Sequence, residues 1–220
     1  MMEKTVAKIR RDFGRISSGD NKEIQEAARL LLDGILGENA GKYPRLIVKL
    51  LQGMGFCLFR TIFKTPGQTG LLAVDPSLEE LDPRYERGRV IFVDSRTSTA
   101  HQRFVIATLL GHYIFDFDEA NEITYYEMYQ GKEADEAGMR ANRFALELLM
   151  PANDFVRKCN ELEREQGEVF SMPATITRLS KYFDSPVAAV RKRLEQTGMF
   201  QEEGGAVVVA NNIDSPGDCE

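Results

Sequence analysis

Residues 103–113, RFVIATLLGHY, and residues 141–151, ANRFALELLMP, decide the fold of this chain. The first stretch belongs to a long apolar run, residues 104–115, which is typical of a buried helix. Thr97, Ser98 or Thr99 can cap the start of that helix with a side-chain oxygen. The second stretch has apolar residues at helical spacing and ends at a proline, which predicts another core helix over residues 133–150.

The first stretch has part of the pattern of a zinc-peptidase helix. Such a helix carries two histidines four residues apart, so that both imidazoles face one metal, and a glutamate after the first histidine to activate water. Here residues 108–112 read TLLGH, and only His112 is present. Taken alone, one histidine is more typical of a core position, and the second stretch is equally typical of an ordinary amphipathic helix.

Taken together, the two stretches resemble the ImmA/IrrE (DUF955) metallopeptidase family. Its members typically show RFTxAHELGHY and, some tens of residues later, ExxANxFAxxLLMP; the resemblance covers residues 45 to 200. It implies an α+β, zincin-like domain with a small antiparallel sheet, flanking N-terminal helices and a C-terminal helix-turn-helix-like hairpin.

The resemblance also implies which positions would carry the family's chemistry. In that family the first histidine, the glutamate and the second histidine align with Thr108, Leu109 and His112, in that order, and the third metal ligand aligns with Gly138. Two of the three inferred ligands and the general base are therefore replaced by residues that cannot do their work. We expect zinc to be absent and no catalytic residue to remain.

Neighbouring carboxylates are the candidates for substitute ligands. Asp135 lies three residues before Gly138 and shares its helix face more nearly than Glu136, which is two residues away. A rearranged metal site would combine His112 with one of these two residues, or with Asp116 or Glu119. One histidine with one displaced carboxylate is a poor zinc site compared with the usual three protein ligands.

The rest of the chain is expected to form four segments. The predicted divisions are an N-terminal helical segment at 1–43, a zincin-like domain at 44–170, a helical hairpin at 171–200 and an acidic tail at 201–220. Three apolar or β-branched runs predict the antiparallel sheet, at 56–63, 71–74 and 90–93. The tyrosine-rich stretch 116–130 receives no element, and 206–210 can add a strand.

The hairpin is locally basic in an acidic chain. Five basic residues against two acids give residues 173–197 a net charge of +3, and the candidate nucleic-acid contacts are Arg178, Lys181, Arg191, Lys192 and Arg193. A helix pair of this kind can enter a major groove. The alternative is a packing module whose charges face water.

Composition narrows the class of protein. The chain has 220 residues and a formal charge of −6, which argues against a surface devoted to nucleic acid or membrane. The three cysteines are far apart and odd in number, and no apolar run approaches a membrane span. These features favour a cytoplasmic protein with reduced thiols.

Three functions remain open at this stage. The resemblance implies an ancestral role in cleaving a regulatory protein, commonly a helix-turn-helix repressor of mobile elements or stress responses. The first hypothesis is a non-catalytic pseudopeptidase that binds and regulates a protein or peptide partner, such as that repressor. The alternatives are an active metallopeptidase with a rearranged metal site and a DNA-binding transcriptional regulator.

Overall fold

The computed structural model describes residues 2–36, 46–118, 120–121, 123–131, 134–166, 171–199, 201–203 and 206–208. Several predictions fall outside these residues: the segment boundary at 43/44, the candidate ligand Glu119, the start of the second core helix at Glu133, and most of the acidic tail with Cys219. Among the described residues, no helix is long and apolar enough to cross a membrane.

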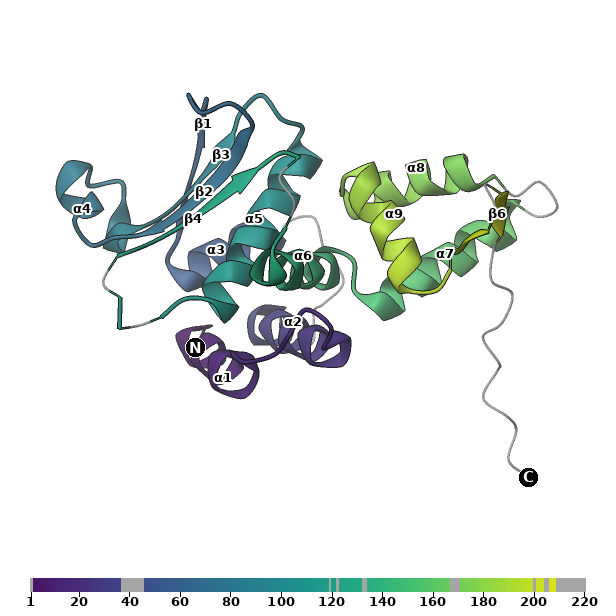
Figure 1. Cartoon of the computed structure of the whole chain (residues 1–220), viewed down its shortest axis with the longest axis horizontal. Coiled ribbons are helices and arrows are strands. Elements are labelled where there is room, and N and C mark those ends of the chain that lie inside the picture. The colour runs from purple at the N-terminus through teal and green to yellow at the C-terminus, as the bar shows by residue number, and fades with distance from the viewer. Residues whose placement is uncertain are drawn as a thin grey trace.

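A four-stranded mixed sheet lies at one end of the molecule (Figure 1). The order of its strands is β1-β3-β2-β4. Their bounds are β1 Cys57–Thr61, β2 Gln68–Val74, β3 Arg89–Asp94 and β4 Thr124–Tyr129. A short helix, α4 (Leu78–Leu81), and a 3-10 turn, η2 (Glu86–Gly88), connect β2 to β3.

The prediction of an antiparallel sheet was wrong for one pair of strands, and it missed the fourth strand. β2 pairs antiparallel with β3 and with β4, but β1 runs parallel to β3, with Leu58 opposite Ile91. The parallel pair arises because a long connection through β2, α4 and η2 separates the two strands. The fourth strand, β4, forms from the tyrosine-rich stretch to which no element was assigned.

One face of the sheet packs against the central helix, α5 (Thr99–Phe115). Leu72 and Ile91, on neighbouring strands, have no exposed surface, whereas Phe59 and Phe92 on the opposite face are half-buried and stack on each other. Ser98 caps α5 by accepting a hydrogen bond from the backbone N–H of His101, as predicted. The helix is apolar around most of its circumference, as expected for a helix with neighbours on several sides.

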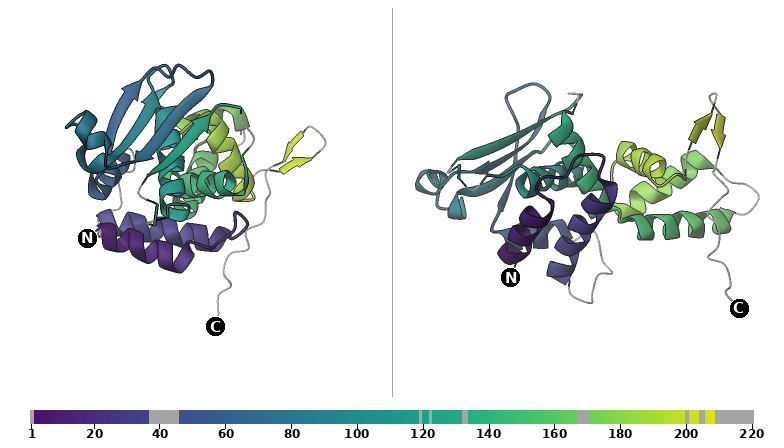
Figure 2. Two further views of the ribbon diagram at one scale, coloured as in Figure 1. Left: turned by 60° about the vertical axis from the view of Figure 1, so that its left-hand side comes forward. Right: turned by 60° about the horizontal axis from the view of Figure 1, so that its bottom comes forward.

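The second core helix, α6 (Glu136–Leu149), packs closely against α5. The contact depends on Gly111, because a Cβ there would lie 2.9 Å from the Cα of Ala141. The helices α1 (Met2–Phe13), α2 (Asn21–Leu36) and α3 (Leu46–Met54) complete this side of the core. Figure 2 shows α1 and α2 side by side, and α2 packs on α6.

The C-terminal helices lie at the other end of the molecule (Figure 1). They are α7 (Ala152–Gln166), α8 (Met172–Phe183) and α9 (Val187–Gln196), followed by a small hairpin of β5 (Gln201–Glu203) and β6 (Ala206–Val208). The turn between α8 and α9 contains Asp184 in the left-handed conformation. Arg103 of α5 donates to the carboxylate and the carbonyl of Asp184, at 2.6 and 3.1 Å, and so ties this turn to the central helix.

Candidate functional site

Thr108 and Leu109 occupy core positions of α5. Thr108 is 1% exposed, and its hydroxyl lies 3.0 Å from the carbonyl of Phe104 and 3.2 Å from the side-chain oxygen of Asn142 on α6. Leu109 has no exposed surface and packs under β2, since a Cβ on Gly70 would come within 3.1 Å of its Cδ1. The side chain of Leu109 therefore fills space between helix and sheet.

His112 is the one member of the predicted set with an ionisable side chain on α5. Its Nδ1 lies 2.7 Å from a carboxylate oxygen of Asp116, one helical turn later. Its ring stacks on that of Tyr126 in β4, with centroids 5.3 Å apart and planes 14° from parallel. Burial, followed by the negative charge of Asp116, raises the pKa of Tyr126, so this phenol stays protonated near neutral pH.

Asp116 joins His112 to the N-terminal helices. Its other carboxylate oxygen pairs with Arg140 of α6, which also donates to the carbonyl of Ile16 at 2.6 Å. A carboxylate on Nδ1 fixes the tautomer and orientation of an imidazole and directs Nε2 outward, an arrangement common in ligating histidines. Here the same carboxylate also neutralises the half-buried guanidinium of Arg140, so Asp116 has two structural partners.

Gly138 and the two candidate substitute ligands lie in or just before the first turn of α6. Asp135 is the N-cap, and its carboxylate accepts a hydrogen bond from the N–H of Gly138 at 2.8 Å. Glu136 accepts from the backbone N–H and the hydroxyl of Ser18, which lower the pKa of its carboxyl. Both carboxylates thus serve the helix start and its contact with the N-terminal segment.

This donor set does not fit the three-ligand zinc site that the family's pattern would place here. If the family's four site positions correspond to Thr108, Leu109, His112 and Gly138, His112 is the only strong zinc donor at these positions. In the part of the chain that the structure describes, no three His, Cys, Asp or Glu residues come together as a metal-binding group.

The basic residues of the hairpin divide into two classes. Arg193 is 2% exposed; its Nε donates to the carbonyl of Met150 at 2.9 Å, and two of its nitrogens lie 2.7 and 2.6 Å from the carboxylate oxygens of Glu147. It is a structural arginine, so its prediction as an accessible nucleic-acid contact is wrong. The exposed residues are Lys181, Arg191, Lys192 and Arg178, the last of which pairs with Glu165.

The strand β4 was missed by sequence reasoning and brings a sheet edge next to His112. It is the last strand in the order of the sheet, and Tyr126 connects it to the helix. The alternation of half-buried Tyr126 and Met128 with exposed Tyr125 and Glu127 is the signal that could have identified it. Tyrosines on both faces weaken that signal.

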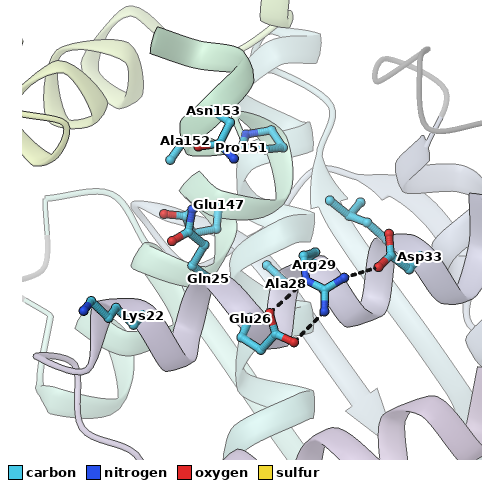
Figure 3. Close-up of a pocket in the computed structure, with 11 residues that line it drawn as sticks. Lys22, Gln25, Glu26, Ala28, Arg29, Asp33, Glu147, Pro151, Ala152 and Asn153 are labelled. Atoms are coloured by element: carbon cyan, nitrogen blue, oxygen red, sulfur yellow. Dashed lines mark hydrogen bonds and ion pairs between the residues drawn. The ribbon is translucent and has the colours of Figure 1, made fainter. Parts of the chain in front are cut away.

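A separate cavity of about 420 Å³ lies between α2 and the junction of α6 with α7 (Figure 3). Arg29 pairs there with Glu26 and Asp33, at 2.6 and 2.7 Å, and Glu147 is held by Arg193. Because these charges are mutually neutralised, the cavity presents little net charge to a ligand. It contains none of the residues at the aligned metal positions.

The comparison with known protein families agrees with the fold and the order of the two core helices. A search among curated proteins finds no match to this chain. Residues 69–195, more than half of the chain, match the model of the IrrE N-terminal-like domain (Peptidase_M78), and they include α5, α6 and the C-terminal helix pair. The chain therefore belongs to the IrrE N-terminal-like, peptidase-like family.

Proposed function

We propose that this protein is a non-catalytic member of its peptidase family that binds and regulates a protein partner. The observation that carries the proposal is the burial of Leu109 at the position of the general base. A carboxylate at that position must reach a water molecule, whereas Leu109 packs under Gly70 with no exposed surface. Thr108 and Gly138 stand at two of the positions that bind the metal in the family's pattern. We therefore propose that the domain binds a partner and does not cleave it.

The outer edge of β4 is the surface that we propose for this partner. Gln130 donates inward to the carbonyl of Gly67, so by alternation the backbone groups of Tyr125 and Glu127 point away from β2. An extended segment can add to such an edge through main-chain hydrogen bonds. His112 and Tyr126 lie beside the edge and can contact the side chains of the segment.

A helix-turn-helix repressor is the partner class that we propose, since proteins of this family generally act on such repressors. Binding without cleavage would sequester the repressor or compete with an active relative. We place this activity in the cytoplasm, consistent with the free thiols of Cys57 and Cys159.

Strand addition can be tested with a proline in β4. Glu127→Pro removes an outward N–H from an edge strand that tolerates proline at low cost, and Glu127→Ala is the matched control. Partners captured in cells would be identified by mass spectrometry. We expect a partner that is recovered intact with the wild type and the alanine variant, and lost with the proline variant. Chelator-sensitive cleavage of the captured partner, or equal capture by the two variants, would contradict the proposal.

An active peptidase with a rearranged metal site is the first alternative. The contact between His112 and Asp116 favours it, because it leaves Nε2 oriented as in a ligating histidine. Against it, Asp116, Asp135 and Glu136 each have other partners. Loss of a measured hydrolytic activity in His112→Ala, with its folding unchanged, would favour this alternative.

DNA binding through the hairpin is the second alternative, and it now rests on a smaller set of residues. The exposed charges of Lys181, Arg191 and Lys192 support it, and Arg193 does not contribute. It predicts affinity for duplex DNA that falls steeply with salt and is weakened by Arg191→Glu together with Lys192→Glu. Affinity that is unchanged by this double reversal would exclude it.

A further inference from the structure

A second cavity, of about 320 Å³, lies between α1, the end of α3, the start of β3 and the last turn of α5, and neither His112 nor Leu109 lines it. Its volume is at the lower end of the range of small-molecule pockets. Its apolar walls come from Val6, Met54 and Tyr113, each at most 4% exposed. The cavity therefore has a buried apolar wall, against which a short hydrocarbon chain can pack.

Two arginines line this cavity. Arg10 lies over the rings of Tyr113 and Phe117, at 4.4 and 4.6 Å, and donates to the carbonyl of Tyr113 at 2.7 Å. Arg89 lines the same cavity and donates to the carbonyl of Met54 at 3.0 Å. The guanidinium group of Arg89 is thus held at the cavity by a neutral backbone acceptor.

A third arginine is close to Arg89. A Cβ on Gly55 would lie 3.4 Å from Nη1 of Arg87 and 3.9 Å from Nη1 of Arg89, so both guanidinium groups surround the same point. Gly55 has a φ of +74°, and Arg87 a φ of 57°, so the backbone on both sides takes the left-handed conformation here. Two positive charges this close to one point repel each other, and an anion between them would relieve the repulsion.

Glu3 is the acid at this mouth, and its contacts are loose. Its carboxylate lies 3.7 Å from Nη1 of Arg89 and 4.0 Å from Nη1 of Arg87, beyond the 2.7–2.9 Å usual for a charge-assisted hydrogen bond. Its side chain is 69% exposed, so solvent screens these contacts. Arg87 and Arg89 therefore share one weakly attached carboxylate, in a chain with a net charge of −6.

We propose that this cavity binds a small organic anion, a carboxylate or a phosphate monoester with a short apolar chain. The anionic group would lie between Arg87 and Arg89 in place of Glu3, and the chain would lie against Val6, Met54 and Tyr113. Arginine forks suit both kinds of oxyanion. This proposal does not rest on the function proposed for the β4 edge.

Isothermal titration of the full chain at low ionic strength tests the proposal, with hexanoate, hexyl phosphate and inorganic phosphate as probes. We expect saturable binding of at least one hexyl compound, about tenfold tighter than inorganic phosphate because the chain buries apolar surface. The tighter of the two hexyl probes identifies the anionic group. Added salt should weaken binding.

Three substitutions make the test specific. Arg89→Gln and Arg87→Gln should each weaken binding about tenfold, through loss of a charge-assisted contact. Glu3→Gln should tighten it several-fold by removing the competing carboxylate. Arg84→Gln is the control, because Arg84 pairs with Asp82 on an exposed loop and does not line the cavity.

The use of two arginine variants guards against misfolding. Arg87 is 70% exposed and pairs loosely with Glu3, whereas Arg89 also holds the end of α3. Absence of saturable binding by all three probes would overturn the proposal. Binding that Arg84→Gln weakens as much as Arg87→Gln, or that Glu3→Gln weakens, would overturn it as well.

Discussion

Buried arginines hold the C-terminal helices to the central helix pair. Arg193 of α9 pairs with Glu147 of α6, whose side chain is 12% exposed, and also donates to Met150. From the sequence, Arg193 is one of three consecutive basic residues and is indistinguishable from Arg191 and Lys192. The orientation of α9 in the fold decides that Arg193 forms a buried ion pair while Arg191 and Lys192 are exposed.

Replacing Arg193 with methionine should therefore be costly. It leaves the largely buried carboxylate of Glu147 without its partner, and we expect a cost of about 3 kcal/mol, the lower end of the range for buried pairs, because this carboxylate also lines a cavity. Arg191→Met on the same helix is the control and should change the unfolding free energy by less than about 0.5 kcal/mol. Urea unfolding followed by circular dichroism measures both. Equal midpoints for the two variants would contradict the assignment of Arg193 as a structural clamp.

Gly111 sets the distance between α5 and α6. An added Cβ would meet the Cα and the carbonyl oxygen of Ala141, at 2.9 and 3.0 Å, and these backbone atoms cannot move aside independently of the helix. Gly111→Ala should cost about 1–3 kcal/mol, despite the higher helix propensity of alanine. Thermal unfolding of this variant beside Ala137→Gly, which lowers propensity in α6 without adding atoms, separates the two effects. A variant as stable as the wild type would show that the helices can separate freely.

Local signals explain why the two core helices could be predicted. The cap at Ser98 and the proline after Met150 act within a few residues of the positions that they define. The sheet depends on distant partners, and its prediction was incomplete. The sequence of β1 or β3 alone does not determine that the two strands pair in parallel. β4 carries tyrosines on both faces, so the alternation of polar and apolar residues that marks a strand is weak there.

The start of α6 is held to the N-terminal segment by Glu136. Its two hydrogen bonds from Ser18 favour the charged carboxylate and lower its pKa below the ordinary 4.5. The folded protein therefore takes up this proton less readily than the unfolded chain. The stabilisation is present above pH 4.5 and is lost as the pH falls below 4.5 and through the folded-state pKa.

This sign gives a prediction for Glu136→Gln. The variant should be less stable than the wild type at neutral pH, and the difference should shrink as the pH falls below about 4.5. Unfolding free energies measured by urea at several pH values test it. Ser18→Ala, which removes one of the two donors, should lose part of the same pH dependence. Parallel curves for wild type and Glu136→Gln would contradict the role of this contact.

At the scale of the whole molecule, polar contacts connect His112 to the N-terminal helices through Asp116, Arg140 and Ile16. The sequence could align His112 with the family's pattern, but it could not reveal this network, whose members lie far apart along the chain. Nor could it show that Asp135 and Glu136 already have partners. These contacts connect the helix that carries His112 to the segment between α1 and α2.

The most direct test of this account is the zinc content of the full chain, purified without chelator, exposed to excess zinc and measured by elemental mass spectrometry after buffer exchange. We expect less than about 0.1 zinc per chain, because under the proposed alignment His112 is left without the two further ligands that a stable site requires. His112→Ala should give the same value. About one zinc per chain in the wild type, lost in His112→Ala, would contradict the account and establish a rearranged metal centre.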